Sequence, residues 1–491
     1  MIPKGREFYP GENIFPAVTL DFIAQDGELI PIQKEKIVRR NQSKSLWDIV
    51  VGTGKIWQED KDDEWSRASF PLTLTDRYVG QARNCVASFV YQTDTISNVC
   101  VQCSQETADL NDHQVGNIQV MLQADFQAQR YVDSTQVIDR HHLFKSRKLP
   151  VHPLNTIDTN NKIADLFEKP LYTNAPTSLG ALLMDEKLYL HPPKTRHGLY
   201  PYPDEMRHGV YSVTKSMVGA LSLFYLARRY GADIFDALIT DHVLALADHP
   251  AWQGVTFSHT LNMVTGTEGS ESAEHLLNIL ILARTAEESI HNIASLGDYP
   301  AGPGEQFNYA STNLFVLSYA MQNYVEAKEG KEVYYWDLVQ ENVLTPIGAT
   351  YFTSRHTVEI DSSKGIPILA YGALPTLDEA AKIALLLAND GNYKGQQLLH
   401  SGKTKEAFGR GAWTGYSTNN DYRGENYQHS FWSKRISTPS CKVNVTYMLG
   451  YGGNYVLFFP SKLIVFRFMD EYDLDIRKLV RRTEKIRSSC K

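Results

Sequence analysis

The sequence lacks any apolar run of the roughly 20 residues that a membrane-spanning helix needs, so no bilayer span is expected. It also lacks a basic excess, because 49 Lys and Arg stand against 56 Asp and Glu, a formal net charge of -7. A general nucleic-acid binder needs a basic face for phosphates and is not expected. Residues 1–5 lack the apolar core of a signal peptide, which fits a cytoplasmic protein, or a periplasmic or secreted one whose leader was removed.

Cysteine is scarce, and its five residues are an odd number, which does not indicate a disulfide framework. The closest pair, Cys100 and Cys103, lacks both a second Cys or His pair at zinc-binding spacing and the helix start of a redox motif. Inert thiols or a local disulfide are the simpler interpretations. Histidines show no metal-ligand spacing either, and His259 is expected to pack or to cap a helix. Neither a metal nor an organic cofactor is therefore expected.

The length of 491 residues is too great for one ordinary core, so two or three domains are expected. From residue 16 to about residue 132, short segments alternate apolar and polar residues, as at 86–91 and 118–124. This period of two favours strands, and we expect an all-β N-terminal domain over residues 1–139. Two prolines then indicate a linker over 140–159.

A second domain is expected over residues 160–491. It opens with a short helix at 163–167 and a hairpin at 179–190 that turns at Asp185-Glu186. Helical patterns dominate the middle of the domain, and strand patterns return between 447 and 468, before a last helix. Because strands stand at both ends, we predict one sheet to which both ends of the domain contribute.

The strongest chemical signal is the segment from Tyr211 to Ser216, which places a serine and a lysine three residues apart ahead of a long apolar run. Residues three apart on a helix share a face. Serine needs a base within hydrogen-bond reach, and a partly desolvated lysine can be that base once its pKa falls toward neutrality. Ser212 is therefore the candidate nucleophile and Lys215 its activator. A surface serine that caps a helix is the alternative, and the same pattern starts at Ser488 in a charged tail.

Three further segments, in the right order, resemble the penicillin-recognising serine hydrolases of the class C β-lactamase type. Residues 302–311 contain Tyr309-Ala310-Ser311, where that family has Tyr-x-Asn, and 450–454 precede a strand, where enzymes that act on penicillins carry Lys-Thr-Gly. Residues 255–266 resemble the helix and turn between the first two signatures. The resemblance covers about 160–485. It implies an α+β multidomain protein, in which an antiparallel sheet flanked by helices, with a helical subdomain, follows the all-β N-terminal domain.

The resemblance also implies roles for single residues. Tyr309 would relay protons with Lys215, since a tyrosine's ordinary pKa of about 10 makes it useless as a base without a nearby cation. The oxyanion would be met by the N–H of Ser212 and by one on the strand entered at Gly452-Gly453. A core tyrosine and a plain tight turn are the alternatives. The residues expected to contact substrate are Ser311, Tyr451, Gly452, Gly453 and Asn454.

Two departures bear on the substrate. Gly450 stands where β-lactam-binding enzymes place a lysine, and Ser311 stands where they place an asparagine, so efficient β-lactam hydrolysis is not expected. Glycine in the third signature is familiar among relatives such as family VIII carboxylesterases and the 6-aminohexanoate-dimer hydrolase. We therefore predict a serine hydrolase that forms an acyl-enzyme on Ser212 and cleaves a small-molecule ester or amide. A D-amino-acid peptidase, a β-lactamase, and a non-hydrolytic binding or sensor protein with the same fold are the alternatives.

Overall fold

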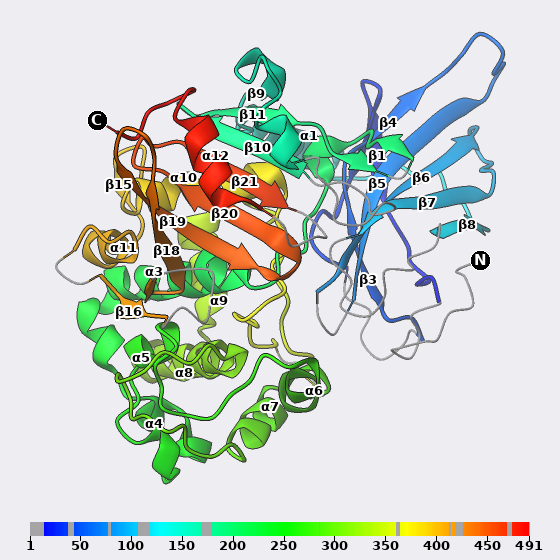
Figure 1. Ribbon diagram of the computed structural model, residues 1–491. Helices are drawn as coiled ribbons and strands as arrows, with labels where there is room; N and C mark the ends of the chain where they lie inside the picture. The colour runs from blue at the N-terminus through cyan, green and yellow to red at the C-terminus, as the bar shows by residue number, and fades with distance from the viewer. Residues whose placement is uncertain are drawn as a thin grey trace.

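The chain forms two bodies, each built on its own β-sheet (Figure 1). The computed structural model describes residues 14–37, 44–76, 80–106, 118–167, 179–195, 197–283, 285–359, 364–411, 414–418, 426–468 and 474–490. Within these ranges, no helix is both long and apolar enough to cross a membrane.

The N-terminal body is an eight-stranded sheet whose neighbouring strands pair antiparallel. Alternating side chains of its long central strands bury a separate apolar core that includes Trp47, Phe70 and Val101. The alternating segment 86–91 lies inside one of these strands, as its period of two predicted. The strands are β1 (Phe22–Gln25), β2 (Glu28–Pro31), β3 (Trp47–Val51), β4 (Gly54–Trp57), β5 (Ser66–Asp76), β6 (Ala82–Tyr91), β7 (Val99–Glu106) and β8 (Ile118–Leu122).

The segment 140–159, which was expected to be a linker, instead contains regular secondary structure. Helix α1 (Ser134–Ser146) runs across its start, and strand β9 (Val151–Pro153) pairs in parallel with the edge of the second sheet. Proline cannot donate to a ladder but is tolerated on an edge strand, so Pro150 and Pro153 mark a sheet edge here and not a flexible connection.

The second sheet has nine strands in the order β16-β17-β18-β19-β20-β21-β10-β11-β9. The predicted hairpin is confirmed, with positive φ at Asp185 and Glu186 as a tight two-residue turn requires. Strand β10 pairs with β21, so both ends of the domain build this sheet, as predicted. The strands are β10 (Leu179–Met184), β11 (Lys187–His191), β16 (Tyr416–Ser417), β17 (Asn426–Gln428), β18 (Phe431–Ser437), β19 (Lys442–Gly450), β20 (Asn454–Phe458) and β21 (Ile464–Phe468).

Helices cover this sheet and form a helical lobe beside it (Figure 1). The apolar run that follows Lys215 is buried, as its composition predicted, and packs against both the sheet and the lobe. The helices of the domain are α2 (Ala164–Phe167), α3 (Leu221–Tyr230), α4 (Ile239–His242), α5 (Phe257–Leu261), α6 (Ala273–Leu276), α7 (Ala286–Ile293), α8 (Ser311–Glu329), α9 (Tyr335–Val339), α10 (Leu377–Ala388), α11 (Ser401–Ala407) and α12 (Ile476–Thr483).

The N-terminal sheet forms hydrogen bonds with the segment that leads into Ser212. The Asn84 side chain donates to the carbonyl of Arg207 over 2.8 Å and accepts from its N–H over 3.1 Å, which imitates a backbone pair. Nearby, the hydroxyl of Tyr200 donates to the carbonyl of Cys85 over 3.0 Å. These contacts fix the chain a few residues before the candidate nucleophile.

Two disulfides join Cys85 to Cys103 and Cys441 to Cys490, and among the described cysteines Cys100 carries a free thiol. The odd number of cysteines, which did not indicate disulfides, is explained by two disulfides and one free cysteine. Cys100 and Cys103 cannot meet because residues three apart on a strand point to opposite faces, whereas Cys85 lies directly across from Cys103 on β6.

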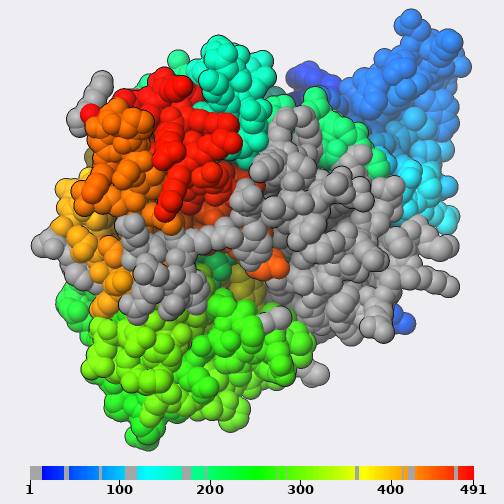
Figure 2. Space-filling model, viewed as in Figure 1, coloured from blue at the N-terminus to red at the C-terminus, as the bar shows by residue number. Residues whose placement is uncertain are grey.

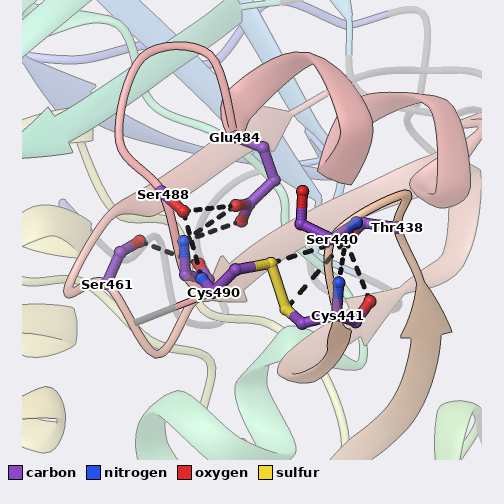
Figure 3. The surroundings of a disulfide bond; sticks show 8 residues. Thr438, Ser440, Cys441, Ser461, Glu484, Ser488 and Cys490 are labelled. Carbon is purple, nitrogen blue, oxygen red and sulfur yellow. Dashed lines mark hydrogen bonds between the residues drawn. A yellow bond between two sulfur atoms is a disulfide. The ribbon is translucent and has the colours of Figure 1, made fainter.

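The second disulfide ties the end of the chain to the turn before β19 (Figure 3). Around it, the Thr438 hydroxyl donates to the carbonyl of Cys441, and the Ser488 hydroxyl donates to the Glu484 carboxylate over 2.9 Å. Ser488, which begins the second Ser-x-x-Lys pattern, thus belongs to this structural cluster.

Candidate active site

Ser212 lies at the start of a buried helix and follows a strained residue. Tyr211 has a φ of 45°, an uncommon conformation for a residue with a side chain. The Thr214 hydroxyl holds this bend by donating to the Tyr211 carbonyl over 2.5 Å. A π-helical turn over Lys215–Ala220 then continues into α3, and such turns are frequent at functional sites. This geometry places Ser212 where the positive end of the helix dipole favours a developing anion.

Lys215 is 1% exposed and has all three of its N–H groups engaged. Its Nζ lies 2.8 Å from Ser212 Oγ, 2.9 Å from Ser311 Oγ and 3.0 Å from the carbonyl oxygen of Ala370. Burial lowers the pKa of Lys215 to about 8, against the opposing effect of Glu271. Near neutral pH, both protonation states of this lysine are therefore populated, as a general base beside a serine requires.

The ring of Tyr309 contacts the same lysine. Lys215 Nζ lies 4.8 Å from the centroid of the Tyr309 ring, a distance typical of a cation–π contact. The ring packs against Trp432 with centroids 5.5 Å apart. Ser212, Lys215 and Tyr309 thus lie together, from segments that are far apart in the sequence.

A carboxylate that the sequence analysis missed completes this cluster. Glu271 accepts from the backbone N–H of Ser311 over 2.5 Å and from the Ser311 hydroxyl over 3.0 Å. Its position in a polar loop carries no spacing signal that links it to either motif. The Ala370 carbonyl was missed for the same reason, since any residue has one.

The third signature forms the turn between β19 and β20. Gly450 ends β19, and a Cβ on it would lie 2.1 Å from the carbonyl oxygen of Val210, so no side chain fits there. Tyr451 follows and packs edge-on against Tyr211, with centroids 5.6 Å apart. Tyr451 is 39% exposed.

The remaining predicted substrate contacts are placed by the same turn. Gly452 and Gly453 are buried with φ of 76° and 82°, values that favour glycine. Asn454 is fully buried, and its side-chain amide donates to the Tyr451 carbonyl over 2.6 Å, which holds the turn. His259 forms a capping box with Thr256 at the start of α5, so its expected capping role is confirmed.

The surface is hollowed between the sheet and the helical lobe. Figure 2 shows this hollow between the red and orange atoms of the last strands and helix and the green atoms of the helical lobe. The turn at 451–453 belongs to the sheet side, and the loop that contains Glu271 belongs to the lobe.

No family model matches the sequence, and no curated protein matches it. Solved structures do match the fold. A penicillin binding protein from Bacillus halodurans is 16% identical over 69% of this chain and 96% of its own, with a TM-score of 0.45. A D-amino acid amidase from Ochrobactrum anthropi SV3 is 14% identical over 67% and 99%, with a TM-score of 0.46. A class C beta-lactamase is 13% identical over 74% and 98%, with a TM-score of 0.45. These likenesses are distant.

Proposed function

We propose that this protein is a serine hydrolase in which Ser212 attacks the carbonyl carbon of an ester or amide. The observation that carries the proposal is the 2.8 Å hydrogen bond between Ser212 Oγ and a buried lysine whose pKa is lowered to about 8. A surface serine with a solvated lysine, the alternative from sequence, would have neither the burial nor the shifted pKa.

The reaction follows from these contacts. Neutral Lys215 takes the proton of Ser212 as the oxygen attacks, and a tetrahedral intermediate forms. Its collapse expels the alcohol or amine, which receives that proton from Lys215 through the Tyr309 hydroxyl, and leaves the acyl group on Ser212. Water then attacks this ester as Tyr309 and Lys215 take its proton, and the proton passes to Ser212 Oγ when the acid is released.

The oxyanion requires donors close to the attacked carbonyl. We assign the first to the N–H of Ser212 at the helix start. The backbone of Gly450 lies close to this helix start, because a Cβ there would be 2.1 Å from the Val210 carbonyl oxygen and 3.2 Å from the Val213 nitrogen. The second donor is therefore assigned to the backbone at Gly450 and Tyr451, slightly before the Gly452-Gly453 pair expected from the sequence.

The test is a stopped-flow assay with short-chain p-nitrophenyl esters. We expect a burst of about one equivalent of p-nitrophenol per protein, because acylation of a phenyl ester usually outruns deacylation. Intact-mass analysis should show the matching acyl adduct. A protein that releases no p-nitrophenol and takes up no acyl group from an ester or amide panel would not be a hydrolase of this kind.

Tyr309→Phe should lower turnover by at least about a hundredfold, the usual scale for losing a general acid or base. Phenylalanine keeps the ring contact with Lys215 and Trp432, so the thermal midpoint should stay nearly unchanged. Steady-state kinetics and a melting curve on both proteins measure the two effects. Near wild-type turnover would show that Tyr309 acts through its ring alone and that another group moves the proton.

Short-chain esters should be cleaved with a kcat/KM at least about a hundredfold above that of benzylpenicillin. We assign the lysine position of the β-lactam-binding enzymes to Tyr451, because Gly450 has no room for a side chain. A tyrosine there offers no cation to the penicillin carboxylate, and Glu271 adds a negative charge to the site. Steady-state kinetics on both substrate classes measure the ratio. Equal efficiency, or a preference for the β-lactam, would contradict this assignment of the specificity.

A further inference from the structure

The Ser311 hydroxyl stands between two charged groups. It accepts from Lys215 Nζ over 2.9 Å and donates to Glu271 Oε2 over 3.0 Å. Ser311 is 2% exposed, so this hydroxyl has little access to solvent. A continuous chain of hydrogen bonds therefore runs from Ser212 through Lys215 and Ser311 to the Glu271 carboxylate.

The conformation of the loop that carries Glu271 brings its carboxylate to Ser311. Glu268 N–H donates to the Gly297 carbonyl over 2.9 Å, which anchors the start of the loop. Gly269 then passes so close to α8 that a Cβ on it would lie 2.5 Å from the Cβ of Ala310. This approach lets Glu271, two residues later, place both carboxylate oxygens on Ser311 at the first turn of α8.

Among the residues that the structure describes, few titratable groups face Lys215. Tyr309 lies under its Nζ, and Tyr427 packs behind Tyr309, with ring centroids 6.1 Å apart. Burial raises the pKa of Tyr427, which keeps that phenol neutral. The segment that contains Ala370 offers a backbone carbonyl, and the helix of Lys215 offers Ser212. Glu271 is the charged group that acts on Lys215, and it favours the protonated lysine.

We propose that Glu271 is a positioning residue for Lys215: its carboxylate orients the Ser311 hydroxyl, and its charge sets the pH above which Lys215 can take the proton of Ser212. This inference rests on the proposed hydrolase function. A carboxylate whose sole role is to cap α8 would hold the helix start and leave the pH dependence of the nucleophile unchanged.

The test is the pH dependence of the second-order rate at which a fluorophosphonate labels the full-length protein. In the wild type, this rate should rise through the titration of Lys215. Glu271→Gln removes the charge that favours protonated lysine, so we expect the acid limb to move to lower pH by about one unit. Glu271→Asp keeps the charge and should leave the limb near its wild-type position, with a lower maximal rate because the shorter side chain no longer reaches Ser311.

A matched control comes from the same loop. Glu268→Gln removes an equal charge from a residue that is exposed, as Glu271 is, but whose carboxylate accepts from the Gly297 N–H over 3.2 Å and not from Ser311, so it should leave the acid limb in place. An unmoved limb in a folded Glu271→Gln, or an equal shift in Glu268→Gln, would overturn the proposal. If Glu271→Gln does not fold, a shifted limb in Glu271→Asp overturns it alone. Absence of labelling in the wild type would instead refute the hydrolase function itself.

Discussion

Replacement of Ser212 by alanine should abolish covalent labelling by a fluorophosphonate and lower ester turnover by at least about a thousandfold. The reason is that Ser212 Oγ is the atom that Lys215 holds at 2.8 Å at the start of the helix. Without it, the oxyanion donors and the binding surfaces can still act on a water molecule, and this accounts for the residual rate. Intact mass, peptide mapping and steady-state kinetics measure the loss.

The site offers its own control, because Lys215 holds a second serine. Ser311→Ala removes the hydroxyl at 2.9 Å from Lys215 Nζ but leaves Ser212 in place. We expect this variant to be labelled on the peptide that contains Ser212, at a reduced rate. Full labelling of Ser212→Ala, with the adduct mapped to Ser311, would move the nucleophile to the other serine and overturn the assignment.

Lys215→Met should lower kcat/KM for esters by at least about a hundredfold, because Ser212 then has no base within hydrogen-bond reach. Wild-type kcat/KM should rise as pH increases through about 8, the pKa to which burial lowers this lysine. The variant should show a flat profile over the same range. A rising profile with the same midpoint in Lys215→Met would assign the titration to another group.

Stability measurements separate this loss from unfolding. The pKa of Lys215 is about 8 in the folded protein and 10.5 in its ordinary range, so the unfolded chain binds more protons between these values. Stability should therefore rise with pH across that window in the wild type. At pH 7 the buried ammonium lowers stability, and Lys215→Met should melt at or above the wild-type temperature. A variant that melts well below it would show that the lysine also holds the fold.

The sequence predicts those features of the fold that have a local pattern. The hairpin at Asp185-Glu186 follows from two apolar runs around a polar turn. The sheet built from both ends of the domain follows from strand patterns that occur at its beginning and at its end. Ser212 and Lys215 could be paired because a helix places residues three apart on one face. Tyr309 was found through a motif, although the approach of Lys215 to its ring has no sequence signal.

The features that were missed depend on contacts between distant segments. Glu271 reaches Ser311 because Gly269 lets two backbones pass closely, and one glycine in a polar loop does not reveal its neighbour. The motif resemblance sets Gly450 at the family's lysine, whereas the crowding against Val210, which the sequence does not reveal, leaves no room for a side chain there. The partner of Cys103 depends on strand register, which pairs it with Cys85. Spacing along the chain cannot supply any of these.

The pairing of β10 with β21 sets the order in which a nascent chain can mature. The β10–β11 hairpin is translated before the helices of the lobe, and all of these helices are translated before β21. Until then β10 is an open edge that can pair with other chains, and contacts so distant in sequence form slowly. A nascent chain that still lacks β19 to β21 already contains Ser212 and Lys215, but not the turn that faces them.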